Sequence, residues 1–567
     1  MVTIAVEQHD LEQLIGAKLP SDLTALNEIL SQIKCEATRT FSEESGVEEL
    51  SLENKDTNRP DLWSPEGVAR ALRGFLGLET GVRNYSIVGP SGVSIKVDPR
   101  LRLIRPFIAC SVVKNASLSD TAIRGLMHLQ DKLDESYGRG RRRSSIGLYE
   151  FDLIVPPLKY EVSRPDDTSF VPLGTNESMT MREILRRHPK GIEYGHIVES
   201  NPLWPILLDS RDNVLSFPPI INSNDLGRIA PQTRNVLVEV TGTSLDTVMN
   251  ALMMVTISLA DRGGRVYSSE IHYPFGKTRK AVTPVLKTHR LRLDLGYVGS
   301  VLGVDLPASQ AIKLLRRTRF DAYRRSSDNS LDVIVPCSRL DIMHPVDIIE
   351  DIGIAYGLNK IKPRWPPHGT VGGITRQHEF NDLLREIMVG LGFQEVLTFT
   401  LSNPDKLFTR MNLTPESVVE LQNPRVLTLT CLRNWLVPSL LDVLSGNVHV
   451  PYPQQVFEAG DCVVRMSSEV KETPKLAGVT CHAQASFTEA RASLDAMLVN
   501  LGIEYRIEEL DHGSFLEGRA ASIHLGNGQA GIVGELHPQV LENWGIQNPA
   551  AAFELDARTL CRAATNH

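Results

Sequence analysis

A segment rich in proline and glycine interrupts the chain past its middle. It runs Ile361-Lys-Pro-Arg-Trp-Pro-Pro-His-Gly-Thr-Val-Gly-Gly373. Proline removes a backbone donor and fixes φ, and glycine loses the most conformational freedom on ordering, so regular helices and strands rarely run through such a stretch. We therefore expect a linker at 361–373, with separately folded parts on either side of it.

The rest of the chain divides into four predicted domains, which fits its 567 residues at about 150 residues per domain. Residues 1–85 alternate a strand-like start with amphipathic helices, as an α/β domain does. Residues 86–272 mix β-branched runs with helices, and residues 273–360 form a compact block that is basic in its middle. Residues 374–567 alternate helix and strand signals, which is typical of a mixed domain with an antiparallel sheet. The predicted class is a multidomain α+β fold.

The composition excludes several classes of protein. The net charge is −8, so the whole chain is not a basic nucleic-acid coat, although a local basic patch can still bind a polyanion. The most apolar helix candidate, Val248–Ala260, contains polar residues and is too short to span a membrane. No secretory signal is visible at the start, so we expect a cytoplasmic protein without a membrane segment.

Four carboxylates gather in one short segment and form the clearest candidate metal site. Pro345 suits the first position of a helix, and Asp347, Glu350 and Asp351 then share one helical face. Asp341 lies a short turn upstream. Four converging carboxylates repel one another unless a cation neutralises them, and oxygen ligands of this kind favour Mg²⁺. The alternative is a solvated acidic first turn that the helix dipole stabilises.

A second candidate lies on the predicted strand Val236-Leu-Val-Glu-Val-Thr-Gly242. Glu239 interrupts its apolar residues with an acid, and Thr241 follows two residues later on the same strand face. A carboxylate on an inward face needs a partner, such as a ligand hydroxyl. The alternative is an edge strand whose Glu239 points into water, which is the commoner arrangement for a lone acid in a strand.

Arginines dominate the third candidate segment, Gly138-Arg-Gly-Arg-Arg-Arg143. Two glycines hinge it, so we expect a mobile cationic loop, for which the backbone phosphates of a nucleic acid are natural partners. A solvated charge run that balances the acidic surface fits the composition equally well.

Together these segments resemble one family along nearly the whole chain: the β subunits of phenylalanyl-tRNA synthetase, in their shorter archaeal and eukaryotic cytosolic form. The order and spacing of the motifs carry the resemblance more than any single motif. The matching segments are Asn58-Arg-Pro-Asp-Leu, Leu129-Gln-Asp-Lys-Leu, Gly138-Arg-Gly-Arg-Arg-Arg-Ser-Ser-Ile-Gly-Leu-Tyr149, Pro218-Pro-Ile-Ile-Asn-Ser223, Val240-Thr-Gly-Thr243, Arg339-Leu-Asp with Glu350-Asp-Ile and Tyr356-Gly, and Gly534-Glu-Leu-His-Pro538.

The resemblance implies an α2β2 phenylalanine–tRNA ligase, which attaches phenylalanine to tRNA(Phe) with ATP. It assigns 86–272 to a central α/β editing and tRNA-binding domain, 273–360 to a helix-turn-helix-like domain, and 374–567 to a class II synthetase-like antiparallel core. In this family the aminoacylation site lies on the α subunit, and the β core is a catalytically degenerate copy. This chain agrees, because Gly390-Leu-Gly-Phe-Gln-Glu-Val lacks the arginine of the Gly-x-Gly-x-x-x-Arg element for ATP. We therefore expect this subunit to support assembly, bind tRNA and hydrolyse mischarged tyrosyl-tRNA.

The same resemblance implies site residues. The editing pocket maps onto Leu207, Ser216, Glu239 and Thr241. The archaeal pattern has Asp where this chain has Glu239, so the acid is kept and its reach shifts by one methylene. The family's Mg²⁺ ligands map onto Asp341, Asp347, Glu350 and Asp351, and tRNA contacts are expected from Arg139, Arg141, Arg142 and Arg143.

Two other classes of function remain open. One is a free-standing hydrolase of mischarged tRNA that acts through the central domain without an α partner. The other is a non-enzymatic nucleic-acid-binding scaffold that uses the arginine segment and the basic block. Co-purification separates these functions. A stoichiometric α subunit supports the synthetase, whereas a stable monomer favours the free-standing hydrolase or the scaffold.

Overall fold

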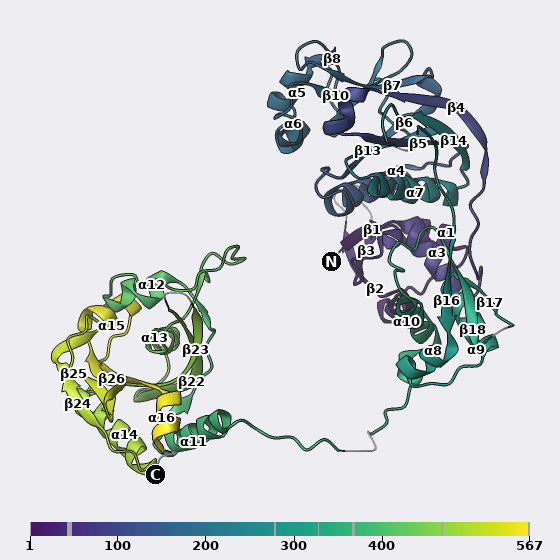
Figure 1. The fold of residues 1–567 in the computed structure, drawn as a ribbon. Coiled ribbons are helices and arrows are strands. Elements are labelled where there is room, and N and C mark those ends of the chain that lie inside the picture. Colours follow the sequence, from purple (N-terminus) through teal and green to yellow (C-terminus); the bar gives the residue numbers. More distant parts are fainter. Residues whose placement is uncertain are drawn as a thin grey trace. The chain divides into compact units, whose positions relative to one another are not determined.

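The chain forms two compact units, Met1–Trp365 and Pro366–His567, and the division falls inside the segment expected to be a linker. The computed structural model describes residues 2–41, 48–276, 279–326, 328–365, 369–466 and 469–564 (Figure 1). Both units combine helices with mainly antiparallel sheets, which confirms the predicted multidomain α+β class. Within these described ranges, none of the helices combines the length and apolarity needed to cross a membrane.

The first part of unit 1 is a three-stranded antiparallel sheet in the order β1–β3–β2, covered by helices. At the start of its third helix, the Ser64 side chain accepts a hydrogen bond from the Gly67 backbone, and Pro65 takes the first helical position. The elements are β1 (Val2–Val6), α1 (Gln8–Ile15), α2 (Leu23–Leu30), β2 (Cys35–Phe41), β3 (Glu48–Asn54) and α3 (Pro65–Phe75).

A ten-stranded sheet forms the middle of unit 1, in the order β12–β11–β10–β7–β4–β14–β5–β13–β6, with β15 paired to β14. In this order β13 lies between β5 and β6, and β6 forms one edge. The strands are β4 (Ile87–Val97), β5 (Phe107–Lys114), β6 (Ser144–Glu150), β7 (Leu158–Ser163), β10 (Trp204–Leu208), β11 (Val214–Phe217), β12 (Ile221–Asn222), β13 (Val236–Gly242), β14 (Arg265–His272) and β15 (Lys280–Thr283).

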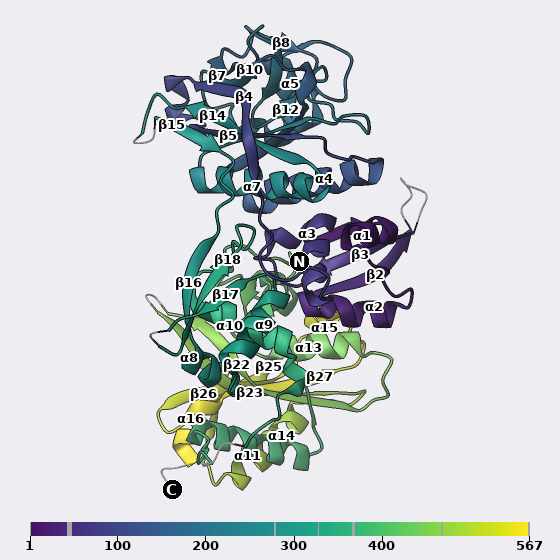
Figure 2. The same cartoon turned by 90° about the vertical axis from the view of Figure 1, so that its right-hand side faces the viewer.

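Helices α4 (Asp120–Lys132) and α7 (Leu245–Asp261) cover one face of this sheet (Figure 2). The valines at 236, 238 and 240 of β13 pack with Val248 and Leu252 of α7 in one core. Leu237 belongs to a second core on the opposite face. Because side chains alternate along a strand, Glu239 and Thr241 share that opposite face with Leu237.

A small insertion packs against the end of the sheet that carries β10 and β11. Its core includes Met181 and Ile184 from one helix and Trp204 and Phe217 from the two strands, whose aromatic rings stack with their centroids 5.5 Å apart. The elements are β8 (Ser169–Phe170), β9 (Met179–Thr180), α5 (Met181–Arg187) and α6 (Pro189–Tyr194).

The last part of unit 1 is a three-stranded antiparallel sheet, β16–β18–β17, packed against three helices around a core of its own. Its third helix begins with Pro345 at the first position, as the sequence predicts. The elements are β16 (His289–Asp294), α8 (Leu295–Leu302), α9 (Ala308–Arg317), β17 (Asp321–Arg324), β18 (Ser330–Val335) and α10 (Pro345–Tyr356).

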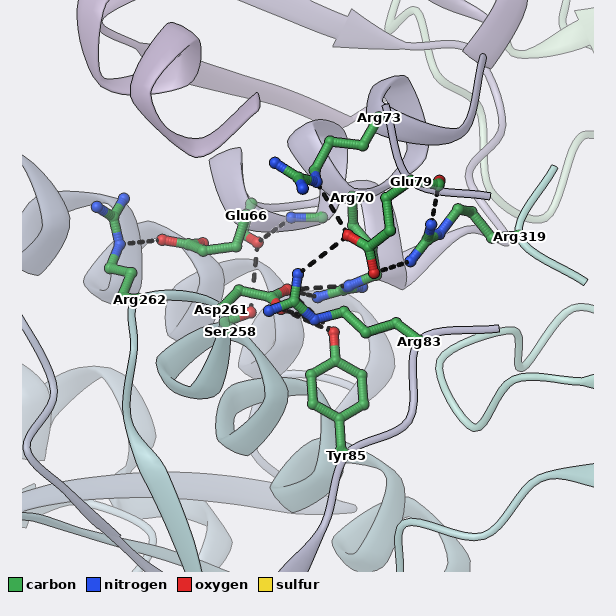
Figure 3. A network of polar contacts seen from close by, with 12 residues as sticks. Glu66, Arg70, Arg73, Glu79, Arg83, Tyr85, Ser258, Asp261, Arg262 and Arg319 are labelled. Carbon is green, nitrogen blue, oxygen red and sulfur yellow. Dashed lines mark hydrogen bonds and ion pairs between the residues drawn. The ribbon is translucent and has the colours of Figure 1, made fainter. Parts of the chain in front are cut away.

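Buried ion pairs tie the N-terminal part of unit 1 to the middle sheet (Figure 3). Arg70 of α3 donates from Nη2 to Asp261 Oδ2 of α7 at 2.7 Å, and both side chains are buried. The Tyr85 hydroxyl donates to Asp261 Oδ1 at 2.9 Å. One carboxylate therefore joins α3, α7 and the segment that leads into β4.

A second carboxylate, Glu79, joins the N-terminal part to the last part of unit 1. Its side chain accepts from Arg73 Nε at 3.0 Å and from Arg319 Nη2 at 2.9 Å, and its backbone carbonyl also accepts from Arg319. Figure 3 shows these side chains converging beside the Arg70–Asp261 pair. The three parts of unit 1 thus share one polar joint.

Unit 2 is built on a seven-stranded sheet in the order β19–β22–β23–β27–β26–β25–β24, with a hydrophobic core on each face. Only the β19–β22 pair is parallel. Its strands are β19 (Gln394–Glu395), β20 (Leu401–Ser402), β21 (Cys431–Leu432), β22 (Gln454–Arg465), β23 (Val470–Cys481), β24 (Arg506–Glu509), β25 (Phe515–Leu525), β26 (Gly528–Leu536) and β27 (Ala550–Asp556). Its helices are α11 (Arg376–Gly390), α12 (Pro404–Leu407), α13 (Val437–Gly446), α14 (Phe487–Asn500), α15 (Pro538–Trp544) and α16 (Ala557–Ala564).

Candidate functional site

The four residues expected to form an editing pocket lie on three strands of the ten-stranded sheet. Leu207 of β10 pairs directly with Ser216 of β11. Glu239 and Thr241 lie on β13, where Glu239 is opposite Gly147 of β6 and Cys110 of β5. Because β13 pairs on both sides, the edge-strand alternative for Glu239 is wrong, and its side chain is only 2% exposed.

Two of the four residues, Ser216 and Glu239, line a cavity of about 210 Å³ beside the edge strand β6. Its other walls come from α4, from β6 and from the segment 217–222, which is largely apolar. Leu207 and Thr241 are fully buried and do not line this cavity. The structure therefore brings two of the four predicted residues, Ser216 and Glu239, to one cavity, and leaves Leu207 and Thr241 buried outside its lining.

Among the residues that line this cavity, three buried side-chain atoms have no hydrogen-bond partner in the described part of the chain. One is Arg141 Nε, which lies 3.3 Å from Asp134 Oδ2 in an ion pair, and the other two are Ser216 Oγ and Glu239 Oε1. Leaving a buried polar atom unpaired typically costs about 1–3 kcal/mol, so such atoms normally meet a ligand or an ordered water. The cavity is therefore suited to a small apolar group that carries a hydroxyl.

The other oxygen of Glu239 is held by the protein. Tyr149 of β6 donates from its hydroxyl to Glu239 Oε2 at 3.0 Å. Burial raises the pKa of Glu239 to about 8, against the opposing effects of the Tyr149 hydrogen bond and the positive charge of Arg105. Glu239 is therefore mainly neutral at pH 7, and a neutral carboxyl group can both donate and accept a hydrogen bond.

Thr241 accepts a hydrogen bond from a buried arginine that no sequence motif marks. Arg105 donates from Nε to Thr241 Oγ1 at 2.9 Å and from Nη2 to Ser145 Oγ at 3.0 Å. The Arg105 side chain is 2% exposed. Its position two residues before the apolar run Phe107-Ile-Ala-Cys is the only sequence signal of that burial.

The arginine segment is an ordered turn. The Arg143 backbone N–H donates to Gly138 O at 2.8 Å, and the Arg141 N–H donates to Asp134 O at 3.0 Å. Arg141 is buried, lines the cavity and donates from Nη1 to the carbonyl of Ile220 at 2.9 Å, so the expectation of a mobile loop is wrong for it. The remaining arginines, Arg139, Arg142 and Arg143, are exposed.

Two of the carboxylates expected to bind Mg²⁺ share one guanidinium group. Arg339 donates from Nε and Nη2 to the two oxygens of Asp341 at 2.9 and 2.7 Å, and its Nη2 also donates to Asp351 Oδ2 at 2.6 Å. All three side chains are at most 10% exposed. Burial raises the pKa of Asp341, but the bond to Arg339 outweighs it and holds this pKa below its usual value.

The other two carboxylates have partners of their own. Asp347 Oδ2 accepts from the backbone N–H groups of Met343 and His344 at 2.8 Å and so caps its own helix, and Glu350 Oε1 lies 2.5 Å from Lys34 Nζ. Across the described ranges, no three or more His, Cys, Asp or Glu side chains are grouped so that they could hold a metal ion. Arg339 therefore pairs Asp341 with Asp351, whereas Asp347 caps its helix and Glu350 pairs with Lys34. Binding of Mg²⁺ by these four carboxylates stays a prediction.

Family models match two parts of the chain. Residues 291–358 match the tRNA synthetase B5 domain, and residues 361–557 match the phenylalanyl tRNA synthetase beta chain CLM domain.

Curated relatives and a solved structure are similar over longer stretches. The phenylalanine–tRNA ligase β subunit of Pyrococcus furiosus is 42% identical over 562 residues, and that of Pyrococcus abyssi is 40% identical over 560 residues. Each alignment covers 98% of this chain and 99% of the relative. The crystal structure of an N-terminal fragment of the Pyrococcus horikoshii phenylalanyl-tRNA synthetase β subunit is 37% identical, with a TM-score of 0.59 over 63% of this chain and 99% of the fragment.

Proposed function

This chain belongs to the family of phenylalanine–tRNA ligase β subunits, and from that premise we propose that it hydrolyses tyrosyl-tRNA(Phe) in the cavity beside Glu239. As a β subunit it is part of an enzyme complex that attaches phenylalanine to tRNA. In this proposal the complex is an α2β2 tetramer whose α subunit carries the aminoacylation site, with ATP as the substrate of the complex and Mg²⁺ as its cofactor.

The observation that carries the editing proposal is the pair of unpartnered atoms in the cavity, Ser216 Oγ and Glu239 Oε1. A synthetase pocket built for phenylalanine rejects tyrosine only weakly, by about a hundredfold, because tyrosine merely adds a hydroxyl. A second site that hydrogen-bonds the hydroxyl favours tyrosine over phenylalanine. Tyrosine satisfies the polar atoms of such a site, and phenylalanine leaves them unpaired. This difference selects the mischarged product for hydrolysis.

The remaining polar groups of the cavity suit the end of a charged tRNA. Gln130, Asp131 and Lys190 line it alongside the apolar segment 217–222 and supply hydrogen-bonding groups for the ester and the ribose. On the same turn as the cavity-lining Arg141, the exposed Arg139, Arg142 and Arg143 are the groups that we assign to tRNA phosphates.

We assign the remaining parts by the same premise. Unit 2 is a class II synthetase-like core without aminoacylation chemistry, which its mainly antiparallel sheet and the missing arginine after Gly392 support. Residues 273–360 are a helix-turn-helix-like domain, in which a short turn joins α8 to α9. Residues 86–272 are the editing domain, and 1–85 are the N-terminal domain.

The test is Glu239→Ala in the complex with the α subunit. We expect hydrolysis of tyrosyl-tRNA(Phe) to fall roughly tenfold or more, because a buried polar partner of the substrate hydroxyl is lost, while phenylalanine charging stays nearly unchanged. Deacylation assays on purified tyrosyl-tRNA(Phe) and charging assays with phenylalanine measure the two quantities.

A matched control is Glu161→Ala, which removes a glutamate of β7 from the same sheet outside the cavity. This variant is expected to hydrolyse tyrosyl-tRNA(Phe) at the wild-type rate. Unchanged hydrolysis in Glu239→Ala would refute the assignment of the cavity.

A further inference from the structure

A glycine lies directly under the carboxyl group of Glu239. Gly147 of β6 is the register partner of Glu239 across the β13–β6 pair. A Cβ at position 147 would lie 2.3 Å from the Tyr149 hydroxyl oxygen and 2.7 Å from Glu239 Oε2. Both distances are too short for any side chain, so glycine is required if the Tyr149–Glu239 hydrogen bond is to form.

Tyr149 follows two residues after Gly147, and its side chain therefore stands on the same face of β6. The ring is fully buried, and the hydroxyl lies 3.0 Å from Glu239 Oε2 and 3.3 Å from Asn222 Oδ1. Asn222 itself lines the cavity. The phenol thus fills the space that Gly147 leaves, and its hydroxyl reaches the carboxyl group of Glu239.

The two oxygens of Glu239 consequently have different surroundings. Oε2 is held by Tyr149, whereas Oε1 has no hydrogen-bond partner among the residues that the structure describes and belongs to a side chain that lines the cavity. A glutamate has three side-chain torsions, and a hydrogen bond to one oxygen restricts the orientation of the whole carboxyl group. The cavity then presents a single oxygen of defined direction, together with Ser216 Oγ, to an incoming hydroxyl.

We propose that Tyr149 is a positioning residue for editing, which fixes Glu239 so that Oε1 alone reads the hydroxyl of a tRNA-linked tyrosine, and that Gly147 provides the space for this arrangement. The inference rests on the proposed editing function. It adds two specificity-determining residues that do not themselves line the cavity.

The experiment compares the complex of the full chain and its α subunit carrying Tyr149→Phe or Gly147→Ala with the wild type. The substrates are tRNA(Phe) charged with tyrosine and the same tRNA charged with phenylalanine. We expect kcat/KM for tyrosyl-tRNA deacylation to fall about tenfold in Tyr149→Phe, because a hydrogen bond to a buried group is lost, and at least as far in Gly147→Ala, which displaces both partners. The preference for the tyrosyl ester should shrink by the same factor.

The matched control is Tyr273→Phe. Tyr273 is a buried tyrosine of the same part of the chain whose hydroxyl donates to the Ile108 carbonyl, away from Glu239. This variant loses a buried hydroxyl of the same kind, and its deacylation rate should stay at the wild-type level. Thermal unfolding of every variant shows whether that variant is folded under the conditions of the deacylation assay.

The pH profile separates positioning from a merely structural role. The Tyr149 hydrogen bond lowers the pKa of Glu239, so its removal should move the midpoint of kcat/KM against pH to a higher pH than in the wild type. Besides Tyr149, the titratable groups that act on Glu239 or that it acts on are Arg105, Asp134, Tyr160 and Cys110, and Tyr149→Phe retains all of them. A loss of folded protein lowers the amplitude without moving the midpoint.

The outcomes distinguish the two levels of the proposal. If the wild-type complex does not deacylate tyrosyl-tRNA(Phe), the proposed function fails and the inference fails with it. If the wild type deacylates it and Tyr149→Phe matches the wild type in rate and midpoint, the positioning role alone is overturned. A slower Tyr149→Phe with a raised midpoint and an unaffected Tyr273→Phe supports the role.

Discussion

Glu239 carries a carboxyl group whose protonation depends on whether the chain is folded. Its pKa rises from an ordinary 4.5 to about 8 on burial, so between these values the folded chain holds a proton that the unfolded chain releases. Stability therefore falls as pH rises through this window, by at most about 1.4 kcal/mol per pH unit, and levels off above it. Asp134, whose pKa burial raises to about 7, acts in the same direction.

We predict that Glu239→Gln removes the contribution of Glu239 to the pH dependence of stability. Thermal unfolding midpoints measured from about pH 5 to about pH 9 should show the variant gaining on the wild type up to about pH 8 and running parallel to it above. Glu161→Gln, from the same sheet, is the control. A constant difference between variant and wild type across this range would mean that Glu239 ionises near its ordinary pKa in the folded chain.

The sequence pattern identifies Glu239 as an unusual acid in an apolar strand, but it does not predict which way the side chain points. The acid in an apolar strand is visible in the sequence, but its burial depends on Cys110 and Gly147, which lie on strands paired from distant parts of the chain. The residues alone favour an exposed edge, and only the resemblance to a family points inward. Tyr149 escapes sequence reasoning for the same reason, since its contact with Glu239 is set by strand register.

At the scale of elements, one buried guanidinium group joins α10 to the segment that precedes it. Replacing Arg339 by methionine leaves Asp341 and Asp351 without their shared partner, and removing one side of a buried ion pair typically costs about 3–5 kcal/mol. We therefore expect Arg339→Met to lower the unfolding midpoint of the full chain markedly. Wild-type stability should be insensitive to a chelator of Mg²⁺, because arginine and lysine already neutralise these carboxylates.

The control for this cluster is Arg324→Met, an exposed arginine of β17, which should change stability by no more than about 0.5 kcal/mol. A wild-type chain that loses stability when Mg²⁺ is removed, together with an Arg339→Met variant that does not, would support the metal interpretation.

The first residues of helices are predictable because their caps depend on neighbouring residues. The ion-pair partners of the acidic residues are not predictable in this way. Pro345 begins its helix where the sequence analysis places it. Ser64 and Ser119 cap their helices through backbone partners three residues away, so such starts depend on a few neighbouring residues. The carboxylates of α10 also lie on the face expected from their spacing. Their partners do not follow from spacing, because Lys34 is 316 residues away from Glu350.

At the scale of the whole molecule, the proposed function assigns aminoacylation and editing to different chains of the complex. We predict that the isolated chain does not charge tRNA(Phe) with phenylalanine, because its core lacks the arginine of the ATP-binding element. Charging assays on the chain alone and after addition of the α subunit measure this, and native mass measurement of the restored complex gives its stoichiometry. Robust charging by the isolated chain would show that unit 2 is a working catalytic core.

The order of the two units along the chain has a consequence for synthesis on the ribosome. Every residue of the editing cavity lies between Met127 and Glu239, and unit 1 ends at Trp365. Translation proceeds at about 5–20 residues per second and domains fold as units, so unit 2 follows roughly ten seconds or more after unit 1. We therefore expect a nascent chain to complete the cavity beside Glu239 and the polar joint around Asp261 and Glu79 while the second unit is still being translated.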